Sequence, residues 1–450
     1  MGQLSESQLS TVRALLNAAP DGAVRDLEET LSAGSGGHET MRAIRAMVVA
    51  EALDRRARNA VFRPLVPLCA PARANLGGVV FPAGVLGGLW RGLKASGGAN
   101  VAVALALADP HHFEAPPESI YDELCGEAAA GLRARANDGY VAAAARLDQG
   151  ASGGAEQFAA YLDLVPVARA ALDRMHEWLG RLNDERIVAA RLAFNDAVAV
   201  AEDGGPRLLE ILYAHLEEPW AILRLVSAVM QRPDERYVAN SELAVFGERL
   251  LEDIDAQLKR VSTFDADRGA PGGVLVGAAV RIAALEIQEF DESLELSRDG
   301  PWGTRLTRQK RSLVQAVEGR LKAVESEVAA ALPLQNSGFR RQGVRGQPKL
   351  TADPDPRQVE RARAFLTLLH EARNSADKLG FGSLWGKTTE AVQARLDTYI
   401  EDLLERLRAA AEGEDLDRIR VFLEVAAEFM GLVSDDRAAQ IVRRRVAAAA

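Results

Sequence analysis

The chain has 450 residues and a formal net charge of −10 at pH 7, with 48% hydrophobic, 26% charged and 5% aromatic residues. These fractions are typical of a soluble globular protein and exclude a disordered, collagen-like or disulfide-rich chain. The length predicts roughly two to four domains. The acidic balance argues against nucleic acid as a partner, because a polyanion is repelled at long range unless basic residues cluster.

The cysteines and the first residues indicate a reducing, cytoplasmic setting. Cys69 and Cys125 lie far apart and belong to no CxxC or Cys/His cluster, so we expect two buried thiols and no zinc site. The first ten residues lack the basic segment and apolar core of a secretory signal. The most apolar stretch that we identify, Leu76–Trp90, is shorter than the ~20 residues of a membrane helix. We therefore expect no transmembrane segment, and the abundance of alanine and arginine suggests a bacterial genome rich in G and C.

Helical periodicity dominates the chain as far as residue 332. Ser5 and Gln8 have the spacing of a capping box, which opens a helix that Pro20 ends. The region 62–115 is the least regular, and its run Val101–Leu107 reads either as a strand or as an alanine-rich helix. Apolar residues in 303–332 recur at spacings of 3 and 4, which predicts a helix with a partner alongside. Helices are predicted at 5–19, 22–32, 39–61, 117–136, 138–148, 154–181, 184–202, 206–217, 219–231, 240–262, 274–297 and 303–332.

The clearest boundary lies at 333–356, which is rich in Pro, Gly and polar residues and predicts a flexible linker. Four helical patterns follow, and the first three each have one apolar stripe, as expected for a small antiparallel bundle. The predicted fold class is all-α, a multi-helix array or bundle followed by a linker and a small C-terminal bundle. We expect an N-terminal helical region with an irregular Gly-rich segment at 1–150, a bundle of long antiparallel helices at 151–332, the linker at 333–356 and the C-terminal bundle at 357–450.

The stretch His370–Gly380 contains the residue of greatest chemical interest. Arg373 follows His370 by three positions, which places both side chains on one face of a helix. This stretch resembles the histidine phosphotransfer motif, in which an exposed helix histidine accepts a phosphoryl group beside a cation, although Asn374 stands where that family has a small residue. The resemblance implies His370 as the phosphoacceptor and Arg373 as its charge partner. The alternative is a surface histidine with an arginine neighbour.

Two further motifs are incomplete. Gly386–Thr389 reads like the end of a P-loop, but Phe381 occupies the position of the first glycine, and the alternative is a helix N-cap at Thr388 or Thr389. The segment 109–114 holds two histidines and two carboxylates, which is a metal-ligand set or a polar surface loop. No second cluster completes it, so we predict no metal and no cofactor.

Two surfaces are candidates for binding a partner. The first is an apolar docking patch in the Gly-rich segment, formed by Val79, Val80, Phe81, Val85, Leu86, Leu89 and Trp90. The second is a basic patch in the linker, formed by Arg340, Arg341, Arg345 and Lys349.

The sequence contains no complete catalytic motif, so whether the chain is an enzyme stays open. We expect a cytoplasmic scaffold or adaptor that binds other proteins through helix surfaces, with a homo-oligomer as a further possibility. The alternative function is a phosphorelay, or other small-molecule handling, centred on His370. An active site whose residues converge only in the fold is a third alternative.

Overall fold

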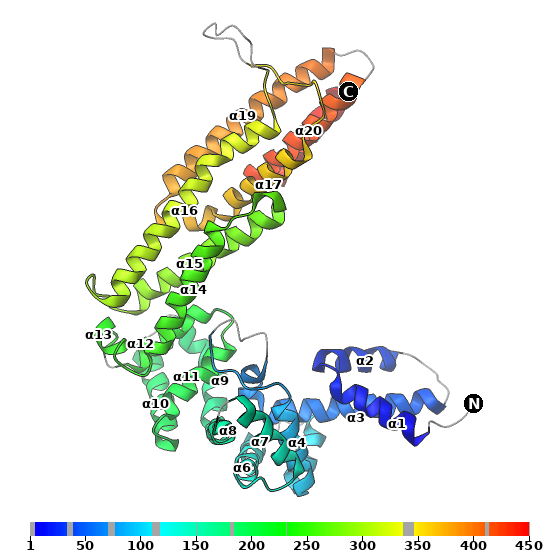
Figure 1. Ribbon diagram of the computed structural model, residues 1–450, viewed down its shortest axis with the longest axis vertical. Coiled ribbons are helices and arrows are strands. Elements are labelled where there is room, and N and C mark those ends of the chain that lie inside the picture. The colour runs from blue at the N-terminus through cyan, green and yellow to red at the C-terminus, as the bar shows by residue number, and fades with distance from the viewer. Residues whose placement is uncertain are drawn as a thin grey trace. The chain divides into compact units, whose positions relative to one another are not determined.

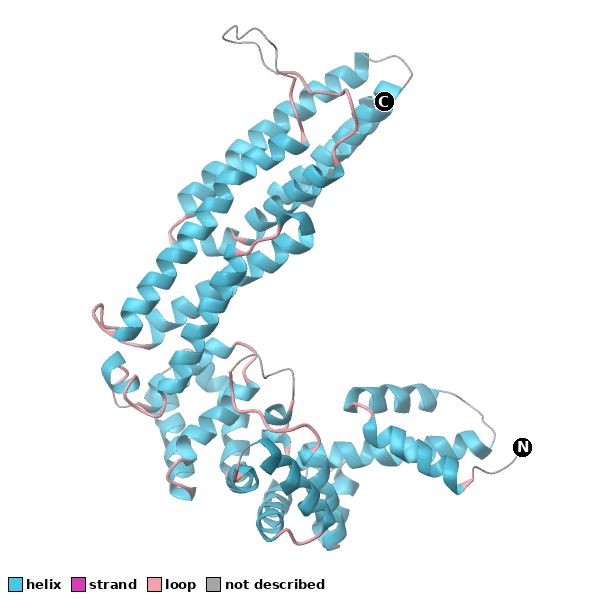
Figure 2. Cartoon of the chain, in the orientation of Figure 1, coloured by secondary structure: helices cyan, strands magenta, loops and turns pink. Residues whose placement is uncertain are grey.

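The computed structural model describes residues 5–33, 39–70, 77–109, 118–150, 152–180, 184–230, 232–335, 346–409 and 414–449. These residues contain 21 α-helices and no β-strand, which confirms the all-α prediction (Figure 2). Contacts divide the chain into two compact units, Met1–Gln231 and Arg232–Ala450. The division lies just after α12 (Ile222–Val229), and not within the expected linker at 333–356.

Unit 1 is built from short and medium helices, and in its main body α4 packs against α7 and α6 against α8 (Figure 1). The first three form a small cluster, the next six form the main body, and the last three close the unit. Its α-helices and 3-10 turns are α1 (Glu6–Ala18), α2 (Asp21–Ala33), α3 (Glu39–Val61), η1 (Arg63–Leu65), η2 (Pro67–Cys69), α4 (Val85–Ser96), α5 (Ala99–Leu107), α6 (Glu118–Ala134), α7 (Asp138–Gly150), α8 (Gly154–Asp163), α9 (Val165–Leu179), α10 (Asp184–Val200), α11 (Gly204–His215), η4 (Pro219–Ala221) and α12 (Ile222–Val229).

Local sequence explains two features of unit 1: the division of one predicted helix, and the helical structure of a run that could have been a strand. The predicted helix 154–181 is divided into α8 and α9 at Leu164, because Pro166 lies in the first turn of α9 and has no N–H to continue the first helix. The strand-like run Val101–Leu107 lies in α5, where Val101 and Ala104, three positions apart, are buried on one face.

Unit 2 is a bundle of long helices. Figure 1 shows α16 and α19 lying side by side, and contacts also join α14, α15 and α16 to one another. At 1.5 Å per residue, the 31 residues of α16 span about 46 Å. The elements of this unit are α13 (Glu235–Val238), α14 (Ala244–Ser262), η5 (Ala266–Arg268), α15 (Ala270–Ser293), α16 (Pro301–Ala331), α17 (Pro356–Glu371), α18 (Arg373–Leu379), α19 (Gly382–Ala409), α20 (Glu414–Val433) and α21 (Asp436–Ala449).

The helices after residue 356 pack against one another and also against the helices that precede the linker. Helix α17 packs against α15 and α16 as well as α20, so the expected domains on either side of the linker share one core. The physical reason is that residues 364–369 of α17 are all buried, whereas one apolar stripe predicts one buried face. Gly273 and Gly277 on α15 allow this close approach, because a side chain at either position would meet α17 at Ala364 or Glu371.

The described ends of the expected linker are held in place. Gln335 N–H donates to the Gln347 carbonyl at 2.7 Å and Lys349 N–H donates to the Pro333 carbonyl at 2.9 Å. The Arg406 side chain of α19 donates to the Pro348 carbonyl at 3.2 Å. The described part of 333–356 is therefore attached to the bundle at both ends.

The most apolar long helix is α15, and not the Leu76–Trp90 stretch. Its length and hydropathy match those of a membrane-crossing helix, but 56% of the apolar window is buried inside the bundle. Contacts with α14, α16 and α17 account for this burial, as in a core helix.

Candidate functional site

The apolar segment that we predicted to be a docking patch lies mostly in the core of unit 1. Five of its seven residues are buried, Val79 is half-buried and Val80 remains 38% exposed. The Phe81 ring makes edge contacts with Phe158 and Tyr161, with ring centroids 4.7 and 5.3 Å apart. The docking-patch prediction is therefore corrected: Phe81, Val85, Leu86, Leu89 and Trp90 are core residues.

The glycines of that segment explain the correction. Gly92 of α4 faces Tyr140 of α7, and an added Cβ would lie 2.8 Å from that ring. A Cβ at Gly139 of α7 would in turn meet the backbone of Gly92. Because α4 and α7 approach so closely, the apolar residues of α4 are covered by side chains that the local sequence does not reveal.

His370 and Arg373 are both exposed, but they lie on two separate helices. His370 is near the end of α17, Ala372 interrupts the helix, and Arg373 begins α18. His370 Nδ1 lies 3.2 Å from the Leu432 carbonyl. The Arg373 guanidinium lies over the Trp385 ring, 5.9 Å from its centroid.

The other sequence motifs do not form a site. Gly386–Thr389 lies inside α19, where Thr389 Oγ1 donates to the Trp385 carbonyl at 2.9 Å, so this segment is neither a P-loop nor an N-cap. His111 and His112 lie outside the described residues, as do Arg340, Arg341 and Arg345 of the basic linker patch, while Lys349 is exposed. Among the residues that the structure describes, no group of three or more His, Cys, Asp or Glu is placed to hold a metal.

Both cysteines are free thiols. Burial raises the pKa of Cys69 and of Cys125 to about 12, so neither thiol is ionised near neutral pH. Cys125 Sγ donates to the Val61 carbonyl at 3.4 Å. These two residues contribute packing and no nucleophile.

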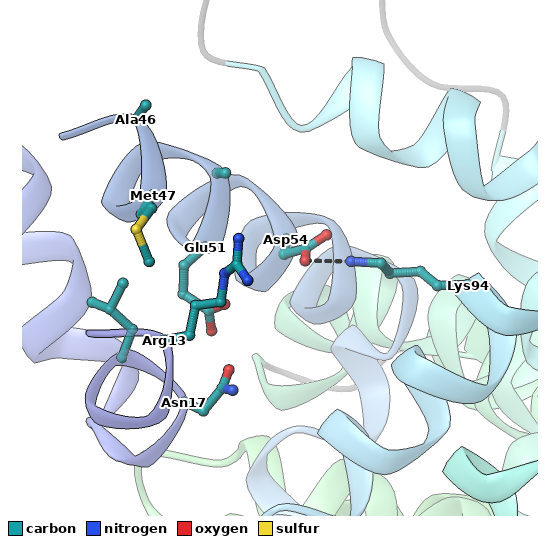
Figure 3. Close-up of a pocket in the computed structure, with 9 residues that line it drawn as sticks. Arg13, Asn17, Ala46, Met47, Glu51, Asp54 and Lys94 are labelled. Carbon is teal, nitrogen blue, oxygen red and sulfur yellow. Dashed lines mark hydrogen bonds and ion pairs between the residues drawn. The ribbon is translucent and has the colours of Figure 1, made fainter. Parts of the chain in front are cut away.

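The candidate site is a pocket of about 490 Å³ between α1, α3 and α4, which the sequence did not indicate (Figure 3). Its volume is in the range of ordinary ligand and peptide-anchor sites. Apolar side chains form one part of the wall and polar or charged side chains form the other. The apolar part is Leu16, Ala46, Met47 and Ala50, and the polar part is Arg13, Asn17, Glu51, Asp54 and Lys94.

Local sequence explains why α1 and α3 present these residues. The predicted capping box is confirmed, since Ser5 Oγ accepts from Gln8 N–H at 3.3 Å and Gln8 Oε1 accepts from Ser5 N–H at 3.0 Å. Leu16 then packs with Val24, Val48 and Ala52 in a small core. On α3 the spacing of positions 46, 47, 50, 51 and 54 places these residues on one helix face beside α1.

Arg55 of α3 ties the elements of this region together. Its guanidinium donates to the Leu16 carbonyl at 2.6 Å and to the Ala19 carbonyl at 2.8 Å, which satisfies acceptors at the end of α1. It also pairs with Glu51 at 2.7 Å and with Asp21 at 2.8 Å. Because Arg55 is only 7% exposed, these interactions hold the wall of the pocket in a defined position.

The carboxylates of the pocket have cationic partners. Glu51 pairs with Arg55, and Asp54 pairs with Lys94 at 2.6 Å and accepts from Trp90 Nε1 at 3.4 Å. Arg13 differs, because its side chain makes no hydrogen bond or ion pair with any residue that the structure describes. Figure 3 shows its guanidinium directed into the pocket between Glu51 and Asp54. The pocket therefore has an apolar wall and a polar wall, and the two cations and two carboxylates of the polar wall balance in formal charge.

A buried carboxyl pair in unit 2 joins α14 and α15. Glu286 is 1% exposed, and burial, together with its hydrogen bond to Asp253 and the charge of that residue, raises the pKa of Glu286 to about 10. Glu286 is therefore protonated at neutral pH and donates to Asp253, while its Oε2 has no hydrogen-bond partner within the described residues. Because Glu286 is almost fully buried, we assign this pair to the core of the bundle.

Comparison with known proteins gives no relative for this chain: no family model, no curated protein and no solved structure matches it significantly.

Proposed function

We propose that this protein is a cytoplasmic, non-enzymatic adaptor that binds another protein through the surface of α1–α3. The observation that carries this proposal is the incomplete apolar core of the region. The α1–α3 core cluster fully buries Leu16, Val24, Val48 and Ala52, and five partly buried apolar residues pack against it: Val12, Ala19, Leu31, Ile44 and Met47. Large apolar side chains remain exposed on the same three helices, namely Leu15 (66%), Leu27 (40%), Met41 (45%) and Val49 (38%).

A protein partner is the natural cover for such a surface. Apolar area exposed to water is unfavourable by roughly 25 cal/mol per Å², and a partner that removes it from water gains that free energy. The pocket between α1, α3 and α4 is a separate concave site on the same part of the chain. These features support binding to a folded or folding protein segment.

The experiment is affinity capture from source-cell lysate with the full-length chain as bait. We expect a stoichiometric partner that is lost from the bait variant Leu15→Glu and retained by Val421→Glu. Val421 is a matched control because it is an exposed apolar residue, 46% accessible, on a helix of unit 2. Point variants are preferable to a truncation at Leu332, since α17 packs against α15 and α16. Equal recovery with both variants, or no partner with any bait, would contradict the proposal.

A specific contact also favours a second candidate function, phosphoryl transfer through His370. A carbonyl oxygen only accepts hydrogen bonds, so the contact with Leu432 places the imidazole proton on Nδ1. Nε2 then carries the lone pair, and the exposed ring presents it as a nucleophile. Incubation with acetyl phosphate tests this function. An acid-labile label that His370→Gln removes and His176→Gln retains supports it, and the absence of label excludes it.

A further inference from the structure

Residues 333–335 and 346–350, which we call the strap, lie beside α19 in unit 2 (Figure 1). Leu334 and Pro348 form an antiparallel bridge, flanked by two backbone hydrogen bonds of 2.7 and 2.9 Å. Pro348 is the only one of these eight residues that is buried, and Leu334 is 36% exposed. Because so little apolar area is covered, polar bonds hold the strap, and a segment of this kind opens at low cost.

Arginines from two helices make these polar bonds. Arg406 of α19 donates to the Pro348 carbonyl at 3.2 Å and to Gln347 Oε1 at 2.6 Å. Arg418 of α20 donates to the Leu350 carbonyl at 3.1 Å. The two acceptors of Arg406 are neutral, so these bonds lack the charge attraction of an ion pair.

Tyr399 lies on the face of α19 that carries the strap. Each helical residue turns by about 100°, so Arg395, Tyr399 and Arg406 fall within about 40° of one another around the helix axis. Arg395 donates to the carbonyl of Leu332, the residue before the strap, at 3.4 Å. Tyr399 is 2% exposed. Burial raises the pKa of its hydroxyl, and the charges of Arg395 and Arg406 act in the opposite direction, as expected for a hydroxyl near both guanidinium groups.

Two polar atoms on this face are buried without a hydrogen-bond partner among the described residues. They are the Tyr399 hydroxyl and Arg395 Nε. A buried polar group without a partner is unfavourable, because it has lost its hydrogen bonds to water. Opening of the strap returns water to both atoms. The hydration that opening restores therefore opposes the bonds that hold the strap closed.

We propose that the strap is a gate that opens as a unit and uncovers Tyr399 while the helices of unit 2 stay folded. The closed state keeps the strap bonds and leaves two polar atoms unpaired. The open state hydrates these atoms and frees the Arg406 guanidinium, so α19 presents an aromatic and cationic surface that the closed state hides. This device belongs to unit 2 and goes beyond the adaptor function proposed for α1–α3.

Acetylation by N-acetylimidazole, located by mass spectrometry, measures the exposure of Tyr399 in the full-length protein. Tyr140 is the matched control, because it is also 2% exposed but packs against Gly92 of α4. Tyr237, which is 48% exposed, verifies that the reagent acts. We expect Tyr399 to react at least about tenfold faster than Tyr140, at a rate that low urea leaves unchanged, because a local opening exposes little surface. Equal rates for Tyr399 and Tyr140, or a Tyr399 rate that rises with urea as global unfolding does, overturns the proposal.

Loss of the arginine that holds the strap should open the gate. Arg406→Ala removes two strap bonds and should accelerate the reaction of Tyr399 by about tenfold. Arg408→Ala is the control, since Arg408 is exposed on the same helix and makes no bond to the described strap residues. Circular dichroism and the urea midpoint verify that the bundle stays folded in both variants. Equal acceleration in both variants, or none in Arg406→Ala, contradicts the gate.

Tyr399→Phe tests the role of the unpaired hydroxyl, because it removes this group and keeps the ring. The strap should then open less often. The readout is hydrogen exchange at Gln335 and Lys349, whose N–H groups form the backbone hydrogen bonds of the strap. We expect exchange at both sites to slow by about tenfold in Tyr399→Phe and to stay unchanged in Tyr237→Phe. Unchanged or faster exchange in Tyr399→Phe overturns the proposal.

Discussion

The substitution Glu286→Gln should make the stability of unit 2 less dependent on pH. Glu286 is buried between α14 and α15 and holds its proton up to a pKa of about 10, compared with an ordinary value of 4.5. Between these values the unfolded chain releases the proton while the folded chain keeps it. The contribution of Glu286 to the free energy of unfolding is therefore fully present below about pH 4.5, and it declines as the pH rises towards 10. Glutamine has the same shape, donates to Asp253 and does not titrate.

The magnitude follows from linkage. Each pH unit between the two values costs the folded state about 1.4 kcal/mol. Between pH 5 and pH 8, the wild type should lose up to about 4 kcal/mol through this group. Glu286→Gln does not titrate at this position and does not have this loss. Its free energy of unfolding relative to that of the wild type should therefore rise between pH 5 and pH 8, by up to about 4 kcal/mol. Any fixed cost of the amide cancels when the two pH values are compared.

Pulse proteolysis in urea, with fragments assigned to residues 232–450 by mass spectrometry, measures the stability of unit 2 in the full-length chain at each pH. Glu252→Gln is the matched control, because Glu252 is an exposed carboxylate on α14 next to Asp253. We expect the control to follow the wild type. A difference between Glu286→Gln and wild type that stays constant from pH 5 to pH 8 would refute the reasoning.

Four further predictions concern residues that pack within one or the other of the two units. Arg55→Ala removes donors from the end of α1 and leaves Glu51 without its partner, so α1 should lose about 2–4 kcal/mol of protection in hydrogen exchange. Glu235→Gln disturbs a buried carboxylate that accepts backbone N–H groups at the start of α16, and the urea midpoint of unit 2 should fall by the equivalent of about 1–3 kcal/mol. Gly273→Ala should destabilise unit 2 by about 1–3 kcal/mol in the same assay, because its Cβ meets α17. Gly319→Ala on α16 should stabilise by up to about 1 kcal/mol, since nothing lies within 4 Å of that Cβ.

Local chemistry explains why many helices were predictable. The capping box of Ser5 and Gln8 involves residues three positions apart, so the sequence alone specifies the start of α1. The apolar seam of α16 is similar, since Val317, Leu321, Val324 and Val328 recur at helical spacing and are buried as predicted. Each of these features depends on neighbours along the chain.

Burial of the Gly-rich segment was not predictable in this way. The glycines between Val85 and Trp90 interrupt the apolar stripe that would mark a buried helix face. The sequence pattern therefore suggests that these residues are exposed. Helix α7, about fifty positions further along the chain, packs against α4, and the Trp90 side chain donates to Asp54 of α3. The run at 364–369 of α17, apolar except for Thr367, was a usable signal, since a helix that is apolar on nearly all sides is central to its bundle.

The sequence by itself determined the all-α class, most helix positions and the absence of a complete catalytic motif, because these depend on spacings within one helix. The tertiary structure alone decided which helices share a core, where the pocket lies and which charges remain uncommitted. Arg13, Met47 and Lys94 come from three different helices, and no local pattern relates them. Glu286 and Asp253 likewise acquire their shared proton only when α14 and α15 pack, since burial and proximity create the raised pKa.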